Sequence, residues 1–225
     1  MSEKINQRAT FVGLFIALGL PFVLGLLHGR SPSDLEFPSK IVLLIIEEWA
    51  VTLALIAIIF FWERQTLGSI GLKKLSAGDF LWGVAGFVIG SISFVLTSPF
   101  VNMLGLKTTS AGILQLAQVP FGLRLGLVLT AGICEEILSR GYPIERLHAL
   151  TGRRILSALI AYAAFVLLHT PFWGAGGTIQ IGFWSLIITV LYVKRRSLAA
   201  CMVMHILNDA YAFLLLPSFA QYLPR

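Results

Sequence analysis

Two adjacent glutamates stand inside an apolar stretch of the chain, in the run GICEEILSR that covers residues 132–140. On a helix, Glu136 and Arg140 are four residues apart, on one face and in the favourable acid-before-base order. Glu135 is rotated from Glu136 by about 100°. Arg140 can therefore hold Glu136 ionised while Glu135 stays free to accept a proton, as a general base does. The alternative is that the three charges only neutralise one another.

Two histidines occur in similar apolar surroundings further along the chain. His169 ends the run FVLLH, and His205 begins the run HILND, which places Asn208 and Asp209 three and four residues after it. An acid beside a histidine fixes its tautomer, whether the imidazole holds a metal or a water. Two imidazoles with carboxylates can activate water, either by binding Zn²⁺ or by direct proton abstraction. Alternatively, each histidine is only a hydrogen-bonded packing residue.

The composition indicates that lipid surrounds most of the elements that must position these residues. Of the 225 residues 57% are hydrophobic and 12% are charged, whereas a soluble domain carries about 25% charged residues. The long apolar runs exclude a disordered chain, and two cysteines are too few for a disulfide scaffold. The net charge of +6 comes without a basic cluster interleaved with aromatics, so we expect no nucleic-acid partner. Cys134 and Cys201 lie in apolar runs, where thiols pack and are inert.

Seven segments of the chain are candidates for crossing a membrane, which takes about 20 mostly apolar residues. They are residues 10–28, 41–62, 79–100, 121–142, 154–171, 178–193 and 198–216. The more polar stretch 101–120 is either a loop with an interfacial helix over 111–119 or half of an eighth span. Every polar connection is too short for a soluble domain. The prediction is an all-α, polytopic transmembrane helical bundle, a single integral-membrane domain over residues 1–225, with its catalytic cavity within the membrane.

The distribution of lysines and arginines predicts the orientation of this bundle, because cytoplasmic loops are enriched in them. With the N-terminus inside, the cytoplasmic side holds twelve of them: Lys4, Arg8, Arg64, Lys73, Lys74, Arg140, Arg146, Arg153, Arg154, Lys194, Arg195 and Arg196. The other side holds five: Arg30, Lys40, Lys107, Arg124 and Arg225. We therefore expect a cytoplasmic N-terminus and a preference for anionic lipid headgroups on the inner leaflet.

The predicted spans raise a problem of depth for the two histidines. If residues 171–177 lie wholly outside, His169 is near the outer surface, while His205 is two to three turns from the inner basic run 194–196. These depths differ by roughly 10 Å or more, too far for two imidazoles to cooperate. Either the span boundaries are different or Pro171 and the following glycines form a connection that dips into a water-filled cavity. We prefer the second interpretation.

The three motifs Glu-Glu-x-x-x-Arg, Phe-x-x-x-His and His-x-x-x-Asp, in this order on membrane helices, resemble those of the CPBP family, the CAAX proteases and bacteriocin-processing enzymes also called Abi. Gly141-Tyr142 and the run RSL at 196–198 are also similar to the family pattern. The resemblance covers about residues 121–216. It implies an intramembrane endopeptidase of a bacterial inner membrane, whose substrate is a membrane-associated or hydrophobic peptide that can carry a lipid.

The resemblance also assigns roles to the residues of the three motifs. The catalytic residues that it implies are Glu135, Glu136, Arg140, His169, His205 and Asp209. Glu135 would activate the attacking water, which the histidines would orient or hold through a metal. Asp209 occupies a position that is often Asn in the eukaryotic CAAX-processing branch, where the amide can donate a hydrogen bond to the oxyanion. An ionised Asp209 cannot donate, so we expect it to be a metal ligand, a partner for His205 or a protonated donor.

The cofactor and the broad function each have an alternative. The added negative charge of Asp209 favours Zn²⁺, held by His169 and His205 with Glu135 or Asp209. Metal-free water activated by Glu135 is the alternative, because no motif places two ligands one helical turn apart as His-Glu-x-x-His does. A non-catalytic bacteriocin-immunity or scaffold protein is the second functional hypothesis. A proton-coupled transporter would need internal repeats, which the sequence lacks.

A second acidic pair, Glu47-Glu48, lies in the predicted span 41–62. Position 52 is threonine rather than arginine, so the catalytic motif does not recur there. Intramembrane acids are costly and commonly functional. We expect this pair either to line a helix near the catalytic cavity or to relay protons.

Overall fold

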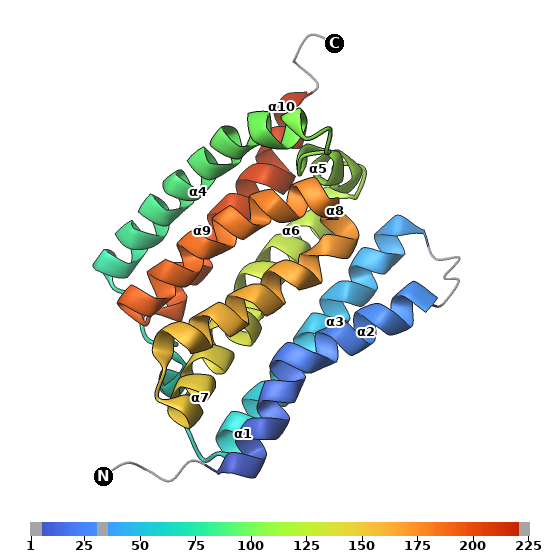
Figure 1. The fold of residues 1–225 in the computed structure, drawn as a ribbon. Coiled ribbons are helices and arrows are strands. Elements are labelled where there is room, and N and C mark those ends of the chain that lie inside the picture. Colours follow the sequence, from blue (N-terminus) through green and yellow to red (C-terminus); the bar gives the residue numbers. More distant parts are fainter. Residues whose placement is uncertain (1–5, 31–35, 221–225) are drawn as a thin grey trace.

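The computed structural model describes residues 6–30 and 36–220, and every regular element in these two ranges is helical (Figure 1). The first half of the chain contains α1 (Gln7–Leu14), the π-helical turn η1 (Phe15–Gly19), α2 (Leu20–Arg30), α3 (Phe37–Ala57), the π-helical turn η2 (Ile58–Trp62), the short 3₁₀ helix η3 (Leu67–Ile70), α4 (Ala77–Met103) and α5 (Ser110–Leu116). The second half contains α6 (Phe121–Thr130), the π-helical turns η4 (Ala131–Glu135) and η5 (Ile137–Gly141), α7 (Tyr142–Thr151), α8 (Arg154–Arg195), α9 (Leu198–Asp209), the π-helical turn η6 (Ala210–Leu215) and α10 (Leu216–Ala220). The predicted fold class, a polytopic helical membrane protein, is confirmed.

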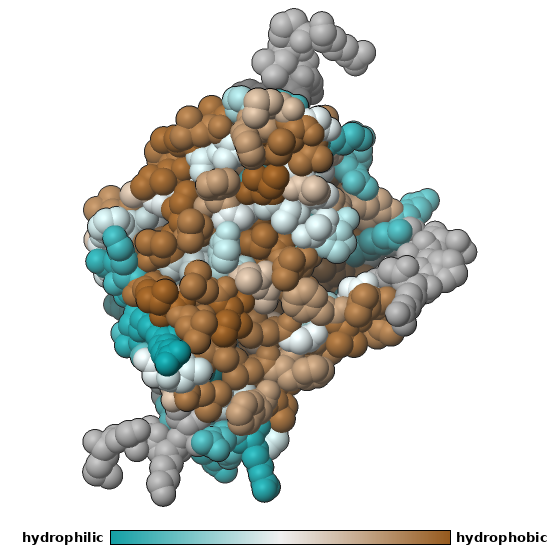
Figure 2. Space-filling model, viewed as in Figure 1, coloured by the Kyte–Doolittle hydropathy of each residue, from teal (hydrophilic) through white to brown (hydrophobic). Residues whose placement is uncertain are grey.

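Five helices in the described part of the chain are long and apolar enough to cross a membrane. They are Gln7–Leu27, Phe37–Trp62, Ala77–Met103, Arg154–Arg195 and Leu198–Ser218. Hydrophobic residues cover most of the molecular face drawn in Figure 2, and the hydrophilic residues lie mainly at its margins. Such a surface suits lipid as the surrounding medium, because apolar side chains need no burial there.

Helix α8 covers two of the seven predicted spans, since its 42 residues are interrupted only at Gly174. This glycine has φ 66° and ψ 179°, in the region of positive φ that side chains disfavour. The two halves fold back on each other, because the rings of Phe165 and Trp184 are 6.5 Å apart and Gly182 lies beside Tyr162. The prediction that residues 171–177 form a dipped connection is therefore wrong, and the turn is confined to one residue.

The stretches around the Glu-Glu-x-x-x-Arg motif also differ from the predicted spans. Residues 101–120 contain the seven-residue α5, which is too short to cross a membrane and matches the predicted loop with a short helix. The helix that starts at Phe121 continues through η4, η5 and α7 to Thr151, well beyond the predicted end at 142. Hydropathy misses this extension because α7 carries charged residues that the protein, rather than water, surrounds.

Two arginines counted in predicting the orientation lie in the interior instead of in a loop. Arg140 is 1% exposed and Arg146 is 6% exposed, and both pair with buried glutamates. They are therefore structural charges, and the basic excess on the N-terminal side rests on the remaining ten residues. Of those ten, Lys4 lies outside the described residues, as does Arg225 on the other side.

Glycines bring the helices of the C-terminal half into close contact with α4. Gly83, Gly86 and Gly90 lie on one face of α4, and a Cβ atom on each would come within 2.7 Å of α9 or α8 atoms. Small residues at such positions let membrane helices approach closely. The α4 helix therefore supports the second half of α8 and supports α9, which carries His205 and Asp209.

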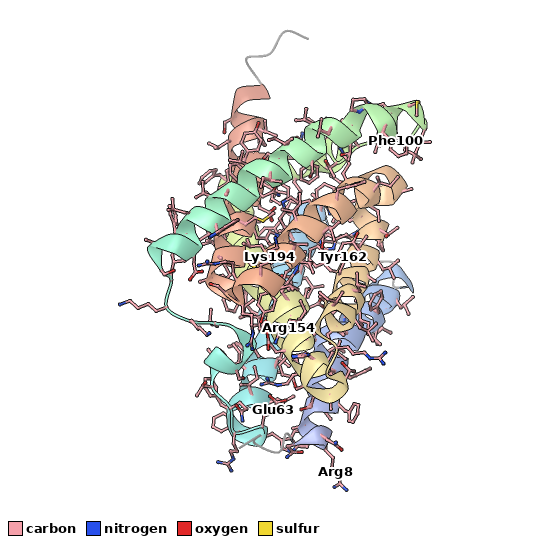
Figure 3. The ribbon with its side chains drawn as sticks, turned by 60° about the vertical axis from the view of Figure 1, so that its left-hand side comes forward. Arg8, Glu63, Phe100, Arg154, Tyr162 and Lys194 are labelled. Atoms are coloured by element: carbon pink, nitrogen blue, oxygen red, sulfur yellow. The ribbon has the colours of Figure 1, made fainter. Side chains whose placement is uncertain are left out.

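A buried ion pair fastens the N-terminal helices to this half. Glu63 accepts hydrogen bonds from Tyr142, Arg146 and Thr10, with Arg146 at 2.7 and 2.9 Å. Glu63 and Arg8 lie towards one end of the bundle and Phe100 towards the other (Figure 3). The network thus ties α1 and the end of α3 to α7 at one end of the molecule.

Candidate functional site

The acidic pair lies where the backbone leaves regular α-helical geometry. Glu135 ends the π-helical turn η4, and η5 begins directly after Glu136. A π turn inserts an extra residue and redirects the side chains around it, and it frequently marks a functional site. Gly132, in η4, has no room for a Cβ atom because Ile206 of α9 lies against it. The glycine thus allows α9 to pack beside the two glutamates.

Glu136 forms a fully buried ion pair with Arg140. The Arg140 Nη1 atom lies 2.9 Å from Glu136 Oε1, and the Glu136 side chain is 0% exposed. Arg140 also donates through Nη2 to the Ser185 hydroxyl at 2.9 Å, and its guanidinium lies 3.8 Å from the centre of the Phe165 ring. These contacts compensate the burial of both charges, which would otherwise be costly.

His205 lies between two carboxylates. Its Nδ1 atom lies 2.7 Å from Glu136 Oε1, and its Nε2 atom lies 3.5 Å from Asp209 Oδ2. The ring also packs edge-on against Trp184, with the centroids 4.8 Å apart. Because a carboxylate can only accept, Nδ1 donates its hydrogen to Glu136 and the ring orientation is fixed. Asn208 donates to Asp209 Oδ1 at 3.1 Å, so this amide is already engaged.

His169 faces the other glutamate. Its Nδ1 atom lies 2.8 Å from the Phe165 carbonyl oxygen, so Nδ1 carries the hydrogen and Nε2 points into the site. His169 Nε2 lies 3.7 Å from Glu135 Oε2, and each of these two side chains is 20% exposed. The Oε2 atom has no hydrogen-bond partner in the described part of the chain. Glu135 and His169 are therefore the groups that a water or a substrate can reach.

All six residues predicted for catalysis lie in one connected site. A buried part holds Glu136, Arg140, His205 and Asp209, and a partly exposed part holds Glu135 and His169. The two histidines contact adjacent glutamates, so the difference in depth that an outside loop at 171–177 would have caused is not found. The chain brings them together because α8 turns at Gly174, only five residues after His169.

Two participants, Ser185 and Phe165, were not predicted to be in the site, and a third, Glu48, belongs to the acidic pair that was expected near the catalytic cavity or in a proton relay. Ser185 accepts a hydrogen bond from Arg140, and nothing in the sequence indicates that a serine in the second half of α8 reaches this arginine. Phe165 belongs to the recognised motif, but its contact with the guanidinium could not be foreseen. Glu48 interacts electrostatically with Glu135, His205 and Asp209. The acidic pair at 47–48 was its only signal.

The arrangement fits a metal only in part. Both histidines use Nδ1 within the protein and turn Nε2 towards the site, as metal-binding histidines do. However, no group of three His, Cys, Asp or Glu side chains among the described residues is arranged to hold a metal ion. The predicted Zn²⁺ therefore remains a prediction, and no step of the mechanism below depends on it. Cys134 and Cys201 are buried free thiols.

The comparison with protein families identifies the region that contains this site. Residues 116–211 match the family model described as Rce1-like: Type II CAAX prenyl endopeptidase Rce1-like. This match is consistent with the CPBP resemblance and confirms it over the segment that carries all three motifs. Neither the search of curated proteins nor the search of solved structures found a match to the chain.

Proposed function

We propose that this chain, Rce1-like over residues 116–211, is an intramembrane endopeptidase that uses a water activated by Glu135. The observation that carries the proposal is the contact across the site between Glu135 and His169. These two side chains are the partly exposed ones, they face each other at 3.7 Å, and Glu135 Oε2 is unpartnered. A water that hydrogen-bonds both groups would be held and deprotonated at one place.

The proposed reaction begins with proton transfer from this water to the Glu135 carboxylate. The water oxygen then attacks the carbonyl carbon of the scissile peptide, and His169 Nε2 orients the water by accepting its second hydrogen. When the tetrahedral intermediate collapses, Glu135 returns the proton to the leaving amine and the C–N bond breaks. The cycle ends with Glu135 ionised and one water consumed, as peptide hydrolysis requires.

The buried part of the site has a positioning role in this proposal. Glu136 accepts from both Arg140 and His205, so it fixes the α9 imidazole relative to the helix that carries Glu135. Asp209 then lies beside the Nε2 edge of His205. An ionised Asp209 cannot donate to an oxyanion, and we assign it to orienting His205. A His205 ring that carries a hydrogen on Nε2 can supply that donor instead.

We further propose that the N-terminus is cytoplasmic and that the protein resides in a bacterial inner membrane. The ten remaining basic residues on the N-terminal side of the spans support this orientation. The substrate would be a peptide at or in the membrane, with a hydrophobic or prenylated segment, and the lipid bilayer would be the surrounding partner. Cleavage assays with the prenylated and the unmodified form of one peptide would show whether the enzyme requires the lipid or only a hydrophobic segment.

Substitution of Glu135 by glutamine tests the proposal. The amide keeps the shape of the side chain but cannot take the proton, so cleavage of a reporter peptide in proteoliposomes should fall by about 10² to 10⁴-fold. The Glu47→Gln variant is the matched control, because it removes a carboxylate from a neighbouring helix. Glu135→Gln protein that folds normally and cleaves at the wild-type rate would exclude Glu135 as the base, whereas a non-catalytic immunity or scaffold protein would show no cleavage at all and would keep its function in this variant.

A further inference from the structure

The turn between α8 and α9 holds an arginine in a backbone conformation that side chains disfavour. Arg196, directly after α8, has φ 47° and ψ 44°, in the left-handed region where glycine is the common residue at a helix end. A residue with a Cβ atom stays in this region only when the surrounding structure compensates the strain. The contacts of the Arg196 side chain therefore need an explanation, and the mechanism above gives them none.

The Arg196 guanidinium binds both carboxylate oxygens of Glu145 on α7. Its Nη2 atom lies 2.6 Å from Glu145 Oε2, and its Nε atom lies 3.1 Å from Oε1. A planar, two-point ion pair fixes orientation as well as distance. The Glu145 carboxylate is buried and also accepts a hydrogen bond from Arg154 at 3.0 Å. The pair thus connects the turn before α9 to the continuation of the helix that carries the two catalytic glutamates.

The ion pair is the last of four contacts between this helix and the segment that contains α9. These contacts are Ile206 with Gly132, His205 with Glu136, Leu198 with Gly141, and Arg196 with Glu145. The partners run in opposite directions along the chain, so the two segments are antiparallel and all four contacts require one register. The contact at the turn and the imidazole contact, about two helical turns apart, therefore depend on each other.

The fold of the turn itself does not depend on the Arg196 side chain. The Leu198 amide donates to the Gly71 carbonyl oxygen at 2.9 Å, and the Ser197 hydroxyl caps α9 by accepting from the Ala200 amide at 3.3 Å. These bonds hold the start of α9 to the residue after η3 rather than to the catalytic helix. The role of Arg196 can therefore be separated by experiment from the formation of the turn.

We propose that Arg196 is a positioning residue for the catalytic site. Through Glu145 it fixes the register of α9 on the helix of the two glutamates, and the first two turns of α9 carry this placement to His205. The imidazole is thereby held against Glu136. This role accounts for an arginine at a position that suits glycine. The inference rests on the proposed function, since it assigns Arg196 to the site in which Glu135 acts.

Replacement of Arg196 by glycine removes the ion pair and keeps the turn, because glycine adopts positive φ readily. Glu145 keeps its contact with Arg154, so the variant should melt close to the wild type. Displacement of a catalytic group by about 1 Å costs about 10²-fold in rate, so kcat should fall by up to that factor with KM unchanged. Arg195→Ala is the matched control and should keep the wild-type kcat, because Arg195 pairs with Asp79 of α4 instead.

An NMR measurement tests the placement of His205 without relying on activity. The hydrogen bond of 2.7 Å from His205 Nδ1 to Glu136 should give a downfield imidazole N–H signal in the wild type, identified by its absence in His205→Phe protein. The signal should move or disappear in Arg196→Gly protein and stay unchanged in Arg195→Ala protein. Arg196→Asn, which also tolerates the left-handed conformation, should behave as Arg196→Gly does and decides the matter if the glycine variant does not fold.

Two results would overturn the assignment. One is a wild-type kcat or an unchanged His205 signal in the folded Arg196 variant, and the other is an equal loss of kcat in Arg195→Ala protein. Cleavage by Glu135→Gln protein at the wild-type rate would instead reject the proposed base and leave the signal of His205 unaffected. The two failures are therefore distinguishable.

Discussion

Removal of Arg140 tests the buried ion network, because it leaves Glu136 charged and without its arginine. The Glu136 side chain is 0% exposed and would keep only the hydrogen bond from His205. The substitution Arg140→Ala also empties the space over the Phe165 ring and frees the Ser185 hydroxyl. Each of these changes destabilises the folded bundle, and the stranded carboxylate is the largest.

The magnitude follows from the cost of an uncompensated buried charge, about 3–5 kcal/mol. For a chain of this size 1 kcal/mol corresponds to about 2–4 °C in melting temperature, so Arg140→Ala should melt about 6–20 °C below the wild type. Activity should also be lost, because Glu136 no longer fixes His205. In the double variant Glu136→Gln/Arg140→Met both charges are gone, so much of the stability should return while activity stays lost.

Thermal melts of the purified protein in detergent provide the measurement, with Arg154→Ala as the matched control. Arg154 is a more exposed arginine, and its partner Glu145 keeps a second contact with Arg196 at 2.6 Å. Because Glu145 keeps its contact with Arg196, the loss of the partly exposed Arg154 strands no charge, so the control should melt close to the wild type. Arg140→Ala protein that melts at the same temperature as Arg154→Ala would refute the reasoning.

Three other experiments address the histidines, the metal and the charge network at the end of the bundle. His169→Ala and His205→Ala should each abolish peptide cleavage yet yield folded membrane protein, as judged by gel filtration. Elemental analysis of fully active enzyme should find less than about 0.1 metal per chain if no metal is needed, whereas a stoichiometric Zn²⁺ that His205→Ala removes would support the predicted site. Burial raises the pKa of Glu145, but hydrogen bonds from Arg196 and Arg154 outweigh it and lower the pKa. The stability that this carboxylate contributes is therefore fully present above the unfolded pKa of about 4.3. It is lost as the pH falls through the lowered pKa of the folded state. The melting temperature of Glu145→Gln protein should therefore fall less steeply than that of the wild type when the pH is lowered.

The contacts between residues of one helix could be predicted from the sequence. The spacing of four residues placed Glu136 with Arg140 and His205 with Asp209, and the structure has these pairs at 2.9 and 3.5 Å. Such pairs depend only on the helical repeat, so a sequence suffices to predict them. The contact between His205 and Glu136 joins residues 69 apart in the chain, and periodicity says nothing about it.

The turn at Gly174 explains how His169 reaches the site without the irregular connection that was predicted over residues 171–177. The sequence around it, with Pro171 and several glycines, is typical of a loop, yet only one residue leaves helical geometry. Tertiary packing of the two α8 halves, through Phe165 and Trp184, keeps the remaining residues helical. Local composition therefore overestimated the length of the irregular connection between the two halves of α8.

The second glutamate of the motif explains how a membrane-embedded site can keep one carboxylate reactive. Glu136 accepts hydrogen bonds from Arg140 and His205 through Oε1 and is closed to solvent, so it can fix geometry but is not reached by a water in the exposed part of the site. Glu135 is one residue away in a widened turn and has neither contact. A single glutamate would not satisfy both demands, because the burial that lets Glu136 pair with Arg140 and His205 also keeps it away from the water that a base must reach. Two adjacent acids, whose side chains are turned in different directions by the π-helical turns, can divide these two roles within one helix.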